Sequence, residues 1–140
     1  MLQSEKARGL TNKKIYHDFA ANVKDTGNKL KEFLMKETNS GKKIYIYGAS
    51  TRGNTLLQYF DIDNKLITAA AERNPYKWGK RTVGSNIPIV SETDARNDNP
   101  DYFLVLPWYF RDEFIKREKA YLSNGGKFIF PLPKFELFSL

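Results

Sequence analysis

The stretch Lys43-Ile-Tyr-Ile-Tyr-Gly48-Ala-Ser50-Thr51-Arg52-Gly53-Asn54-Thr-Leu-Leu57 reads as a buried strand that runs into a glycine-bracketed turn and then into a helix. Gly48 lets the chain leave the strand in a tight turn, and Gly53 permits close packing. The free N–H groups at the start of the helix would face an anion, with the helix dipole behind them. Ser50 and Thr51 add hydroxyl groups, and Arg52 adds a permanent charge. The stretch therefore predicts an open α/β fold with a phosphate site at this turn.

Strand-like and helix-like segments alternate along the chain. Apolar residues recur at steps of three or four from about Thr11 to Thr38, which predicts a long amphipathic helix. Short β-branched and aromatic runs predict five strands, at residues 44–47, 66–71, 87–90, 102–106 and 127–130. The alternation predicts a Rossmann-like, doubly wound α/β fold with a mostly parallel five-stranded sheet and a long N-terminal helix. We expect residues 1–41 to form a helix or connector that packs on the domain, and residues 42–140 to form the domain itself.

The connections between these elements carry further signals. Residues 73–85 are too polar and too interrupted for a regular helix, and a loop of that length in a compact domain is typically functional. Pro88 places the third strand at an edge of the sheet. Ser91-Glu-Thr-Asp94 has the form of a capping box that opens a short helix. A helix through Phe114 and Leu122 should stop at Gly125-Gly126, and the chain after the last strand should be a short apolar tail.

The composition excludes several classes of protein. The chain has 140 residues, no cysteine and one histidine, so disulfides, thiolate catalysis and Cys- or His-cluster metal sites are excluded. No apolar run is long enough for a membrane span, and the N-terminus lacks a signal-peptide core. We therefore expect a cytoplasmic protein with no membrane partner. His17 lies on a charged helix, and it is taken as incidental.

The formal net charge of +7 raises the question of a nucleic-acid partner. The excess lies mainly in the N-terminal segment, where lysines are spread around the expected helix rather than gathered on one face. The aromatic residues fall in strand-like and core-like contexts and not in an RNA-binding pattern. We interpret the basic helix as solvated and expect no nucleic-acid partner.

Unusual residues follow three of the predicted strands, at the ends that should converge on one crevice. Glu72 comes 24 positions after Gly48, about where dinucleotide-binding folds keep the carboxylate that accepts from ribose hydroxyls. Arginines would neutralise a diphosphate, and an aromatic ring would lie against a base or a sugar. The candidate residues for substrate and phosphate binding are Gly48, Ser50, Thr51, Arg52, Gly53, Asn54, Glu72, Asn74, Trp108 and Arg111.

Each of these signals has a plainer structural reading. Ser50 stands where the second glycine of a dinucleotide motif would be, and Ser50 or Thr51 can simply cap the helix. Glu72 can be an ordinary exposed residue or an ion-pair partner of Arg73. Trp108, like its neighbour Tyr109, can pack under the following helix. The pair Asp112-Glu113 fits the first turn of a helix rather than a catalytic carboxylate pair.

Five blocks of the sequence carry a further signal. They are Tyr47-Gly-Ala-Ser-Thr-Arg-Gly-Asn-Thr-Leu-Leu57, Ala71-Glu-Arg-Asn-Pro-Tyr-Lys77, Gly84-Ser-Asn-Ile-Pro-Ile-Val-Ser91, Pro100-Asp-Tyr-Phe-Leu-Val-Leu-Pro-Trp108 and Gly125-Gly-Lys-Phe-Ile-Phe-Pro-Leu-Pro133. Together these blocks resemble the C-terminal domain of the S-adenosylmethionine-dependent sugar C-methyltransferases, over about residues 5–138. Members of that family add a methyl group to a carbon of a nucleotide-linked deoxysugar, often at C-3 of a 4-keto sugar. The resemblance implies a Rossmann-like module that helps to hold the nucleotide sugar against a separate catalytic domain.

The resemblance also implies what this chain leaves to other parts of such an enzyme. The family's cysteine-rich zinc domain and its central domain, with the S-adenosylmethionine site and the catalytic base, have no counterpart in these 140 residues. We therefore read the chain as a fragment or excised domain that holds no cofactor, whose partners are a nucleotide-linked deoxysugar and a linked or associated methyltransferase domain. No catalytic residue is carried over, and His17 does not match the family's catalytic histidine. Two alternatives stay open: a free-standing nucleotide or nucleotide-sugar binding module without catalysis, and an NAD-dependent oxidoreductase fragment, which the absent second glycine disfavours.

Overall fold

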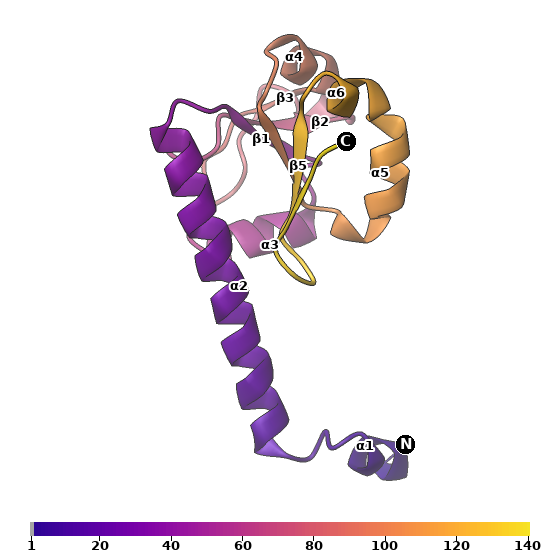
Figure 1. The fold of residues 1–140 in the computed structure, drawn as a ribbon. Coiled ribbons are helices and arrows are strands. Elements are labelled where there is room, and N and C mark those ends of the chain that lie inside the picture. The colour runs from indigo at the N-terminus through magenta and orange to yellow at the C-terminus, as the bar shows by residue number, and fades with distance from the viewer. Residues whose placement is uncertain (1) are drawn as a thin grey trace.

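A computed structural model describes residues 2–140 and contains one six-stranded sheet in the order β3-β2-β1-β4-β5-β6 (Figure 1). Strands β1 to β5 run parallel to their neighbours, and β6 is antiparallel to β5. Both central strands, β1 and β4, are buried along their whole length. The strands are β1 (Ile44–Tyr47), β2 (Ala69–Glu72), β3 (Ile89–Ser91), β4 (Tyr102–Val105), β5 (Lys127–Phe130) and β6 (Glu136–Phe138).

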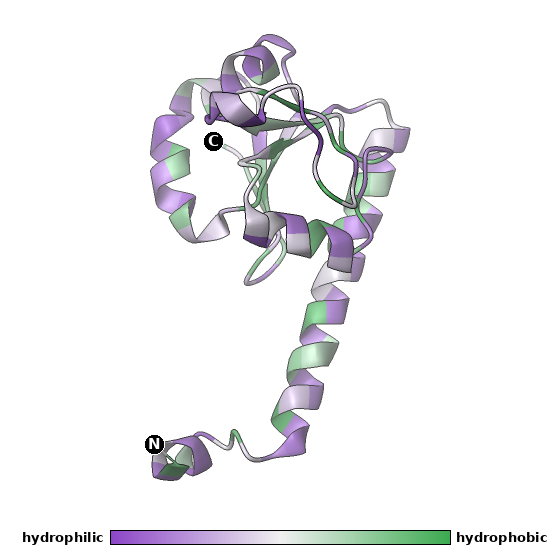
Figure 2. Cartoon of the chain, turned by 180° about the vertical axis from the view of Figure 1, so that it is seen from behind, coloured by the Kyte–Doolittle hydropathy of each residue, from purple (hydrophilic) through white to green (hydrophobic). Residues whose placement is uncertain are grey.

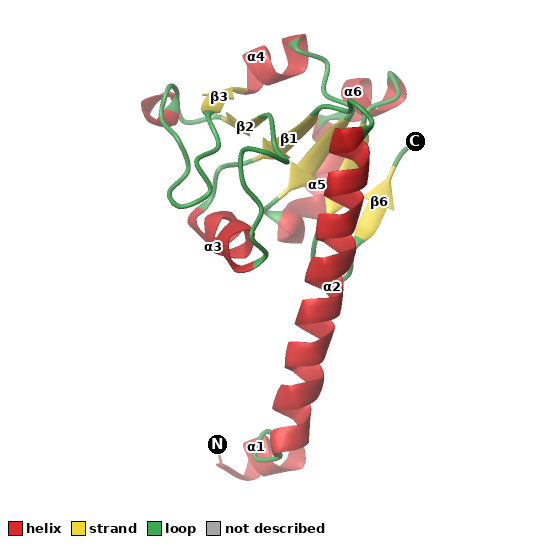
Figure 3. Cartoon of the chain, turned by 90° about the vertical axis from the view of Figure 1, so that its left-hand side faces the viewer, coloured by secondary structure: helices red, strands yellow, loops and turns green. Residues whose placement is uncertain are grey.

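Helices cover both faces of this sheet. Alternate residues of a strand point to opposite faces, and in β1 the two isoleucines join one buried cluster while the two tyrosines join the other. Helices α2 (Lys13–Asn39) and α3 (Thr51–Tyr59) pack on the isoleucine face. Helices α4 (Glu92–Asn97), α5 (Arg111–Arg117) and α6 (Lys119–Ser123) pack on the tyrosine face. Figure 3 views the molecule with α2 in front of the sheet and α5 behind it.

The prediction of a mostly parallel α/β fold is confirmed, but the prediction of five strands is wrong. The sixth strand, β6, lies in the segment expected to be a short apolar tail, and it pairs with β5 from Phe128 opposite Phe138 to Phe130 opposite Glu136. Three residues are too few for an alternating pattern to stand out in a sequence. Strand β3 is an edge strand, as Pro88 predicted.

The helices follow the predicted capping signals, with one interruption. The Ser91 hydroxyl oxygen accepts a hydrogen bond from the Asp94 N–H at 3.0 Å and opens α4. Asp112 and Glu113 lie in the first turn of α5. The single helix expected after Arg111 is divided at Glu118, between α5 and α6. Further short helical segments are α1 (Leu2–Ala7), which was not predicted, and the 3₁₀ turns Pro75–Lys77 and Trp108–Phe110.

Helix α2 is only half integrated into the fold. Its C-terminal half buries Gly27, Leu30 and Leu34 in the core, whereas residues 13–22 are exposed throughout. Figures 1 and 2 show this N-terminal half projecting away from the sheet, with the N-terminus at its far end. Within residues 2–140, no helix is both long enough and apolar enough to cross a membrane.

Candidate functional site

The turn after β1 is fixed by backbone contacts. Gly48 has φ +85°, a conformation that side chains with a Cβ rarely adopt. Its N–H donates to the carbonyl oxygen of Ala71 on β2 at 2.9 Å. A Cβ at Gly48 would lie 2.9 Å from the ring of Pro107. Glycine is therefore required here by the turn and by the end of β4, apart from any ligand.

Helix α3 starts directly behind this turn. The Ser50 hydroxyl oxygen accepts from the Gly53 N–H at 3.0 Å, so Ser50 is the N-cap, as one of the two readings held. The first N–H groups of a helix have no acceptor inside the helix. The Ser50 hydroxyl accepts from the N–H of Gly53, so the N–H groups of Thr51 and Arg52 are the ones that remain at the helix start. A Cβ at Gly53 would lie 2.5 Å from the Leu106 side chain, which explains the close packing of α3 on the end of β4.

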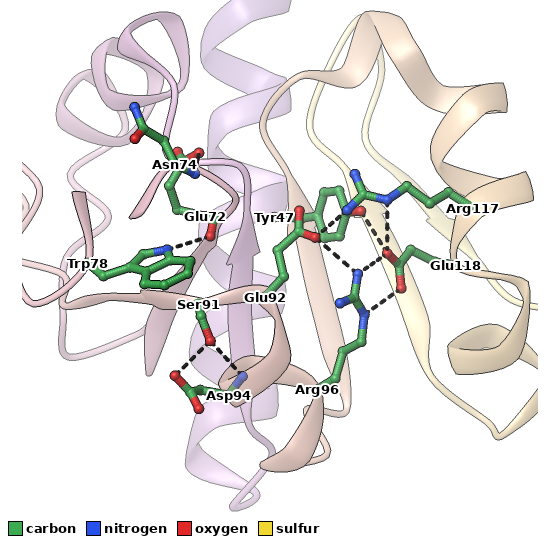
Figure 4. A network of polar contacts seen from close by, with 10 residues as sticks. All are labelled: Tyr47, Glu72, Asn74, Trp78, Ser91, Glu92, Asp94, Arg96, Arg117 and Glu118. Atoms are coloured by element: carbon green, nitrogen blue, oxygen red, sulfur yellow. Dashed lines mark hydrogen bonds and ion pairs between the residues drawn. The ribbon is translucent and has the colours of Figure 1, made fainter. Parts of the chain in front are cut away.

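Glu72 organises the loop that follows β2. Its carboxylate accepts from the Asn74 N–H at 3.0 Å and from Lys77 Nζ at 3.2 Å. Its carbonyl oxygen accepts from the Trp78 indole at 2.8 Å (Figure 4). The side chain of Asn74 in turn caps the 3₁₀ turn by accepting from the Tyr76 N–H at 3.1 Å. The ion-pair partner of Glu72 is thus Lys77 rather than Arg73.

Lys77 also reaches the first turn of the site. Its ammonium group donates to the carbonyl oxygen of Ala49 at 2.9 Å. A pocket of about 290 Å³ lies beside this contact, between the start of α3 and the segment 77–83. The two cationic side chains on its wall are Lys77 and Arg81, and Ser50, Thr51, Asn54 and Thr82 are polar residues that line it.

The far side of the pocket is tied to α3. Gln58 Nε2 donates to the carbonyl oxygen of Val83 at 2.9 Å, and the Ser85 hydroxyl lies 3.4 Å from Asn54 Oδ1. The Arg81 guanidinium donates to the carbonyl oxygen of Asn86 at 2.8 Å. The long polar loop is therefore an ordered wall of the pocket, which is what positions its two cations.

The structure brings together only some of the predicted site residues. The turn residues and Ser50, Thr51, Asn54, Glu72 and Asn74 gather around the ends of β1 and β2, on or next to the pocket. Arg52 instead lies with its guanidinium 5.7 Å from the centre of the Tyr109 ring, and Arg52 and Trp108 line a separate groove.

Arg111 is engaged elsewhere. It donates two hydrogen bonds to the Glu136 carboxylate, at 3.1 and 2.5 Å, and its guanidinium lies over the rings of Phe130 and Phe138. Those rings belong to the tyrosine face of the sheet. The third predicted strand end therefore does not add Arg111 to the crevice.

Lys77, Arg81 and Thr82 were missing from the residues predicted for the site. All three lie in the polar loop 73–85, whose length alone indicated function. The signal was available in its basic residues, but the sequence did not tell which of them face α3. Only the folding back of the loop, where Gly79 and Thr82 donate to the carbonyl oxygens of Ile89 and Ile87, decides this.

A second polar cluster lies on the opposite face and was not predicted. Glu118 is only 4% exposed and accepts from the Tyr47 hydroxyl at 2.8 Å and from Arg96 Nε at 3.0 Å (Figure 4). Arg96 and Arg117 both also pair with Glu92. Burial alone would raise the pKa of Glu118, but the hydrogen bonds from Arg96 and Tyr47 outweigh it and hold the pKa below its ordinary value. Burial also raises the pKa of Tyr47, and its hydrogen bond to Glu118 raises it further.

This cluster is self-contained. Its two carboxylates are balanced by two guanidinium groups, and no side-chain nitrogen or oxygen buried within residues 2–140 lacks a hydrogen-bond partner. These side chains join α4 and α5 to the sheet, and their polar atoms are already occupied by one another. Among the same residues, no group of three His, Cys, Asp or Glu side chains is arranged to hold a metal ion.

Comparison with known proteins gives the class to which this α/β domain belongs. The family described as "C-methyltransferase C-terminal domain" matches residues 1–133, and the chain belongs to this family. The C-methyltransferase NovU of Streptomyces niveus is 34% identical over 134 residues. The match covers 96% of this chain and 32% of NovU, so the chain spans about a third of the length of that relative.

Proposed function

We propose that this chain is the substrate-side domain of an S-adenosylmethionine-dependent sugar C-methyltransferase and that it binds a nucleotide-linked deoxysugar. We further infer that the domain is Rossmann-like and doubly wound, which the strand order 3-2-1-4-5 and the helices on both faces support. The observation that carries the proposal is the pocket beside the start of α3, because Ser50 and Thr51 at the start of that helix line it together with two cationic side chains. Ligands of open α/β sheets bind at this position, outside the carboxyl ends of the strands.

The chemistry of the pocket suits a diphosphate. Arg81 and Lys77 supply positive charge on one wall, and Thr51 in the first turn of α3 lines the other. The start of a helix favours an anion through its N–H groups and its dipole. A volume of about 290 Å³ is at the lower limit for small-molecule sites, so the pocket holds a diphosphate or one ring and not a whole nucleotide sugar. We infer that the rest of the ligand lies against another part of the enzyme.

We propose that methyl transfer takes place on a separate domain. S-adenosylmethionine, when bound there, supplies the methyl group for attack by a carbon of the sugar. The turn of this chain fits that cofactor poorly, since Ser50 stands at the position where a glycine admits close approach and its hydroxyl is committed to capping α3. The role of the present residues is to bind and orient the nucleotide end of the substrate.

The direct test is a titration of the ¹⁵N-labelled chain followed by NMR. Inorganic pyrophosphate should shift the amide signals of residues 48–54 and 72–83, and a nucleoside diphosphate sugar should shift the same set. S-adenosylmethionine should not shift the signals of residues 48–54 or 72–83. NAD is the probe for the alternative that the chain is part of an oxidoreductase. Shifts confined to the lysine-rich residues 13–36 would mean non-specific anion binding and would contradict the proposal.

A further inference from the structure

The projecting half of α2 carries an apolar face that continues the stripe by which the same helix packs on the sheet. Leu30 and Leu34 are fully buried, whereas Phe19, further along the helix, is 68% exposed. Apolar segments recur along the projecting part in Figure 2. Large exposed apolar side chains grouped on one face, rather than scattered singly, are typical of interaction surfaces.

This apolar face forms one wall of a groove of about 760 Å³. Phe19, Ala20 and Val23 line it from α2, and Tyr59 and Phe60 line it from the end of α3 and its C-cap. Trp108 also lines it. Tyr59 is 69% exposed, and a Cβ at Gly27 would lie 2.2 Å from the Phe60 ring, so the two helices meet tightly at Gly27 and diverge beyond it.

The groove and the pocket lie on opposite sides of the first turns of α3. Thr51 and Asn54 face the pocket, whereas Arg52 and Thr55 face the groove. A protein domain bound in the groove therefore lies next to the proposed diphosphate site. The part of the nucleotide sugar that does not fit in the pocket would contact that domain.

The net charge of the chain argues against a second copy of this chain as the occupant. The projecting half of α2 carries Asp18 as well as Lys13 and Lys14, but the whole chain carries a formal charge of +7. Two copies with this net charge repel each other, which disfavours their pairing. In the related NovU, by contrast, about two thirds of the chain lies outside the matched segment, and a C-terminal domain is preceded by the rest of its enzyme. The projecting end of α2 is the end that faces that preceding part.

We propose that the groove between α2 and α3 is the docking surface for the methyltransferase domain of the same enzyme, with Phe19 and Tyr59 as the apolar anchors. This proposal rests on the proposed function. It assigns α2 a role beyond that of a connector: the helix holds the catalytic domain beside the pocket. Large aromatic side chains near the centre of an interface are the residues that contribute most to association.

The experiment compares hydroxyl-radical labelling of the free 140-residue chain with that of the intact C-methyltransferase that has these residues as its C-terminal domain. Labelling of Phe19 and Tyr59 should fall strongly in the intact enzyme. Met35 is the internal reference, because it is 46% exposed on α2 and does not line the groove. Equal labelling of the two anchors in both samples would overturn the proposal.

Phe19→Glu in the intact enzyme should restore Tyr59 labelling to the level of the free chain. The matched control is His17→Glu, which adds the same charge to an exposed position of α2 outside the groove and should leave Tyr59 protected. Sedimentation of the free chain as a dimer that Phe19→Glu dissociates would also overturn the proposal, in favour of a second copy. Pyrophosphate titration of the free chain tests the pocket separately: its failure would refute the proposed binding function, and the labelling result would still decide the groove.

Discussion

Lys77 Nζ lies 2.9 Å from the carbonyl oxygen of Ala49, and this hydrogen bond joins the loop after β2 to the turn after β1. The same nitrogen lies 3.2 Å from the Glu72 carboxylate, so much of its charge is already neutralised. Arg81 on the same wall donates to a backbone carbonyl, and none of the ion pairs found in residues 2–140 involves it. The two cations of the pocket therefore differ: Lys77 holds the turn, and Arg81 is the one that we propose supplies charge for an anion.

Arg81→Gln should weaken pyrophosphate binding by about 1–3 kcal/mol, the scale of a lost charge-assisted hydrogen bond. The melting temperature should change little, because the side chain makes one hydrogen bond on an exposed segment. The measurement is the NMR titration. Lys80→Gln is the matched control, since it removes the same charge from the neighbouring residue, which does not line the pocket. Equal loss of affinity in both variants would indicate a general electrostatic effect and not a site.

Lys77→Met should lower both stability and affinity. The variant leaves the Glu72 carboxylate without its ion-pair partner and the Ala49 carbonyl without its donor, and we expect a loss of about 1 kcal/mol in the free energy of unfolding because the pair is partly exposed. Urea denaturation measures the loss, and the same titration measures the affinity. Unchanged stability would mean that the contact does not hold the turn.

Arg111→Ala should cost stability and leave pyrophosphate binding unchanged. Its guanidinium pairs with Glu136 and lies over two aromatic rings, so it anchors β6 to α5 rather than facing the pocket. The pair is partly exposed, which limits the expected loss to about 1 kcal/mol. Glu136→Gln should give a loss of similar size, because it removes the same ion pair from the other side. A drop in pyrophosphate affinity without loss of stability would return Arg111 to the binding site.

Gly53→Ala should destabilise the fold by about 1–3 kcal/mol, the range for overpacked sites. The added Cβ would meet the Leu106 side chain at 2.5 Å, deep between α3 and the end of β4. Thr55→Ala on the exposed side of the same helix is the control and should change stability by less than about 0.5 kcal/mol. Thermal unfolding of the two variants compares them directly. Wild-type stability in Gly53→Ala would show that the helix shifts without cost.

The elements that sequence alone predicted are those whose signals are local. The strand 44–47 and its glycine turn, the cap at Ser91 and the edge position of Pro88 each follow from residues adjacent in the chain. Strand β6 was missed because its three residues become a strand only by pairing with β5. The break at Glu118 was missed for a similar reason, since that carboxylate is fixed by Tyr47 and Arg96, which lie far away in the sequence.

The residues of the candidate pocket divide in the same way, into those predicted from local signals and those placed by tertiary contacts. The turn residues were found from their spacing, but the direction in which an arginine points is set by tertiary contacts. Arg52 turns to Tyr109, and Arg111 turns to Glu136 on the unpredicted strand. Lys77 and Arg81 reach the pocket only because the loop folds back along β3.

The buried carboxylate of Glu118 should contribute stability to the domain that is lost in acid. Its pKa in the folded chain lies below the ordinary value of 4.5. A depressed pKa means that ionised Glu118 contributes stability above pH 4.5, and that this contribution is lost as the pH falls through the folded pKa. Glu118→Gln should therefore be less stable than the wild type at neutral pH, and the difference should shrink below about pH 4.5.

The size of the loss at neutral pH should fall below the roughly 3–5 kcal/mol typical of breaking a buried ion pair, because Arg96 and Arg117 are each about a third exposed and reach water. Urea midpoints measured from pH 2.5 to 7 give the difference curve. Asp98 and Asp101 also have lowered pKa values, the first chiefly through its hydrogen bond from Lys43, but they titrate in both proteins and cancel in the difference. A difference that stays constant down to pH 2.5 would mean that folding does not shift the pKa of Glu118.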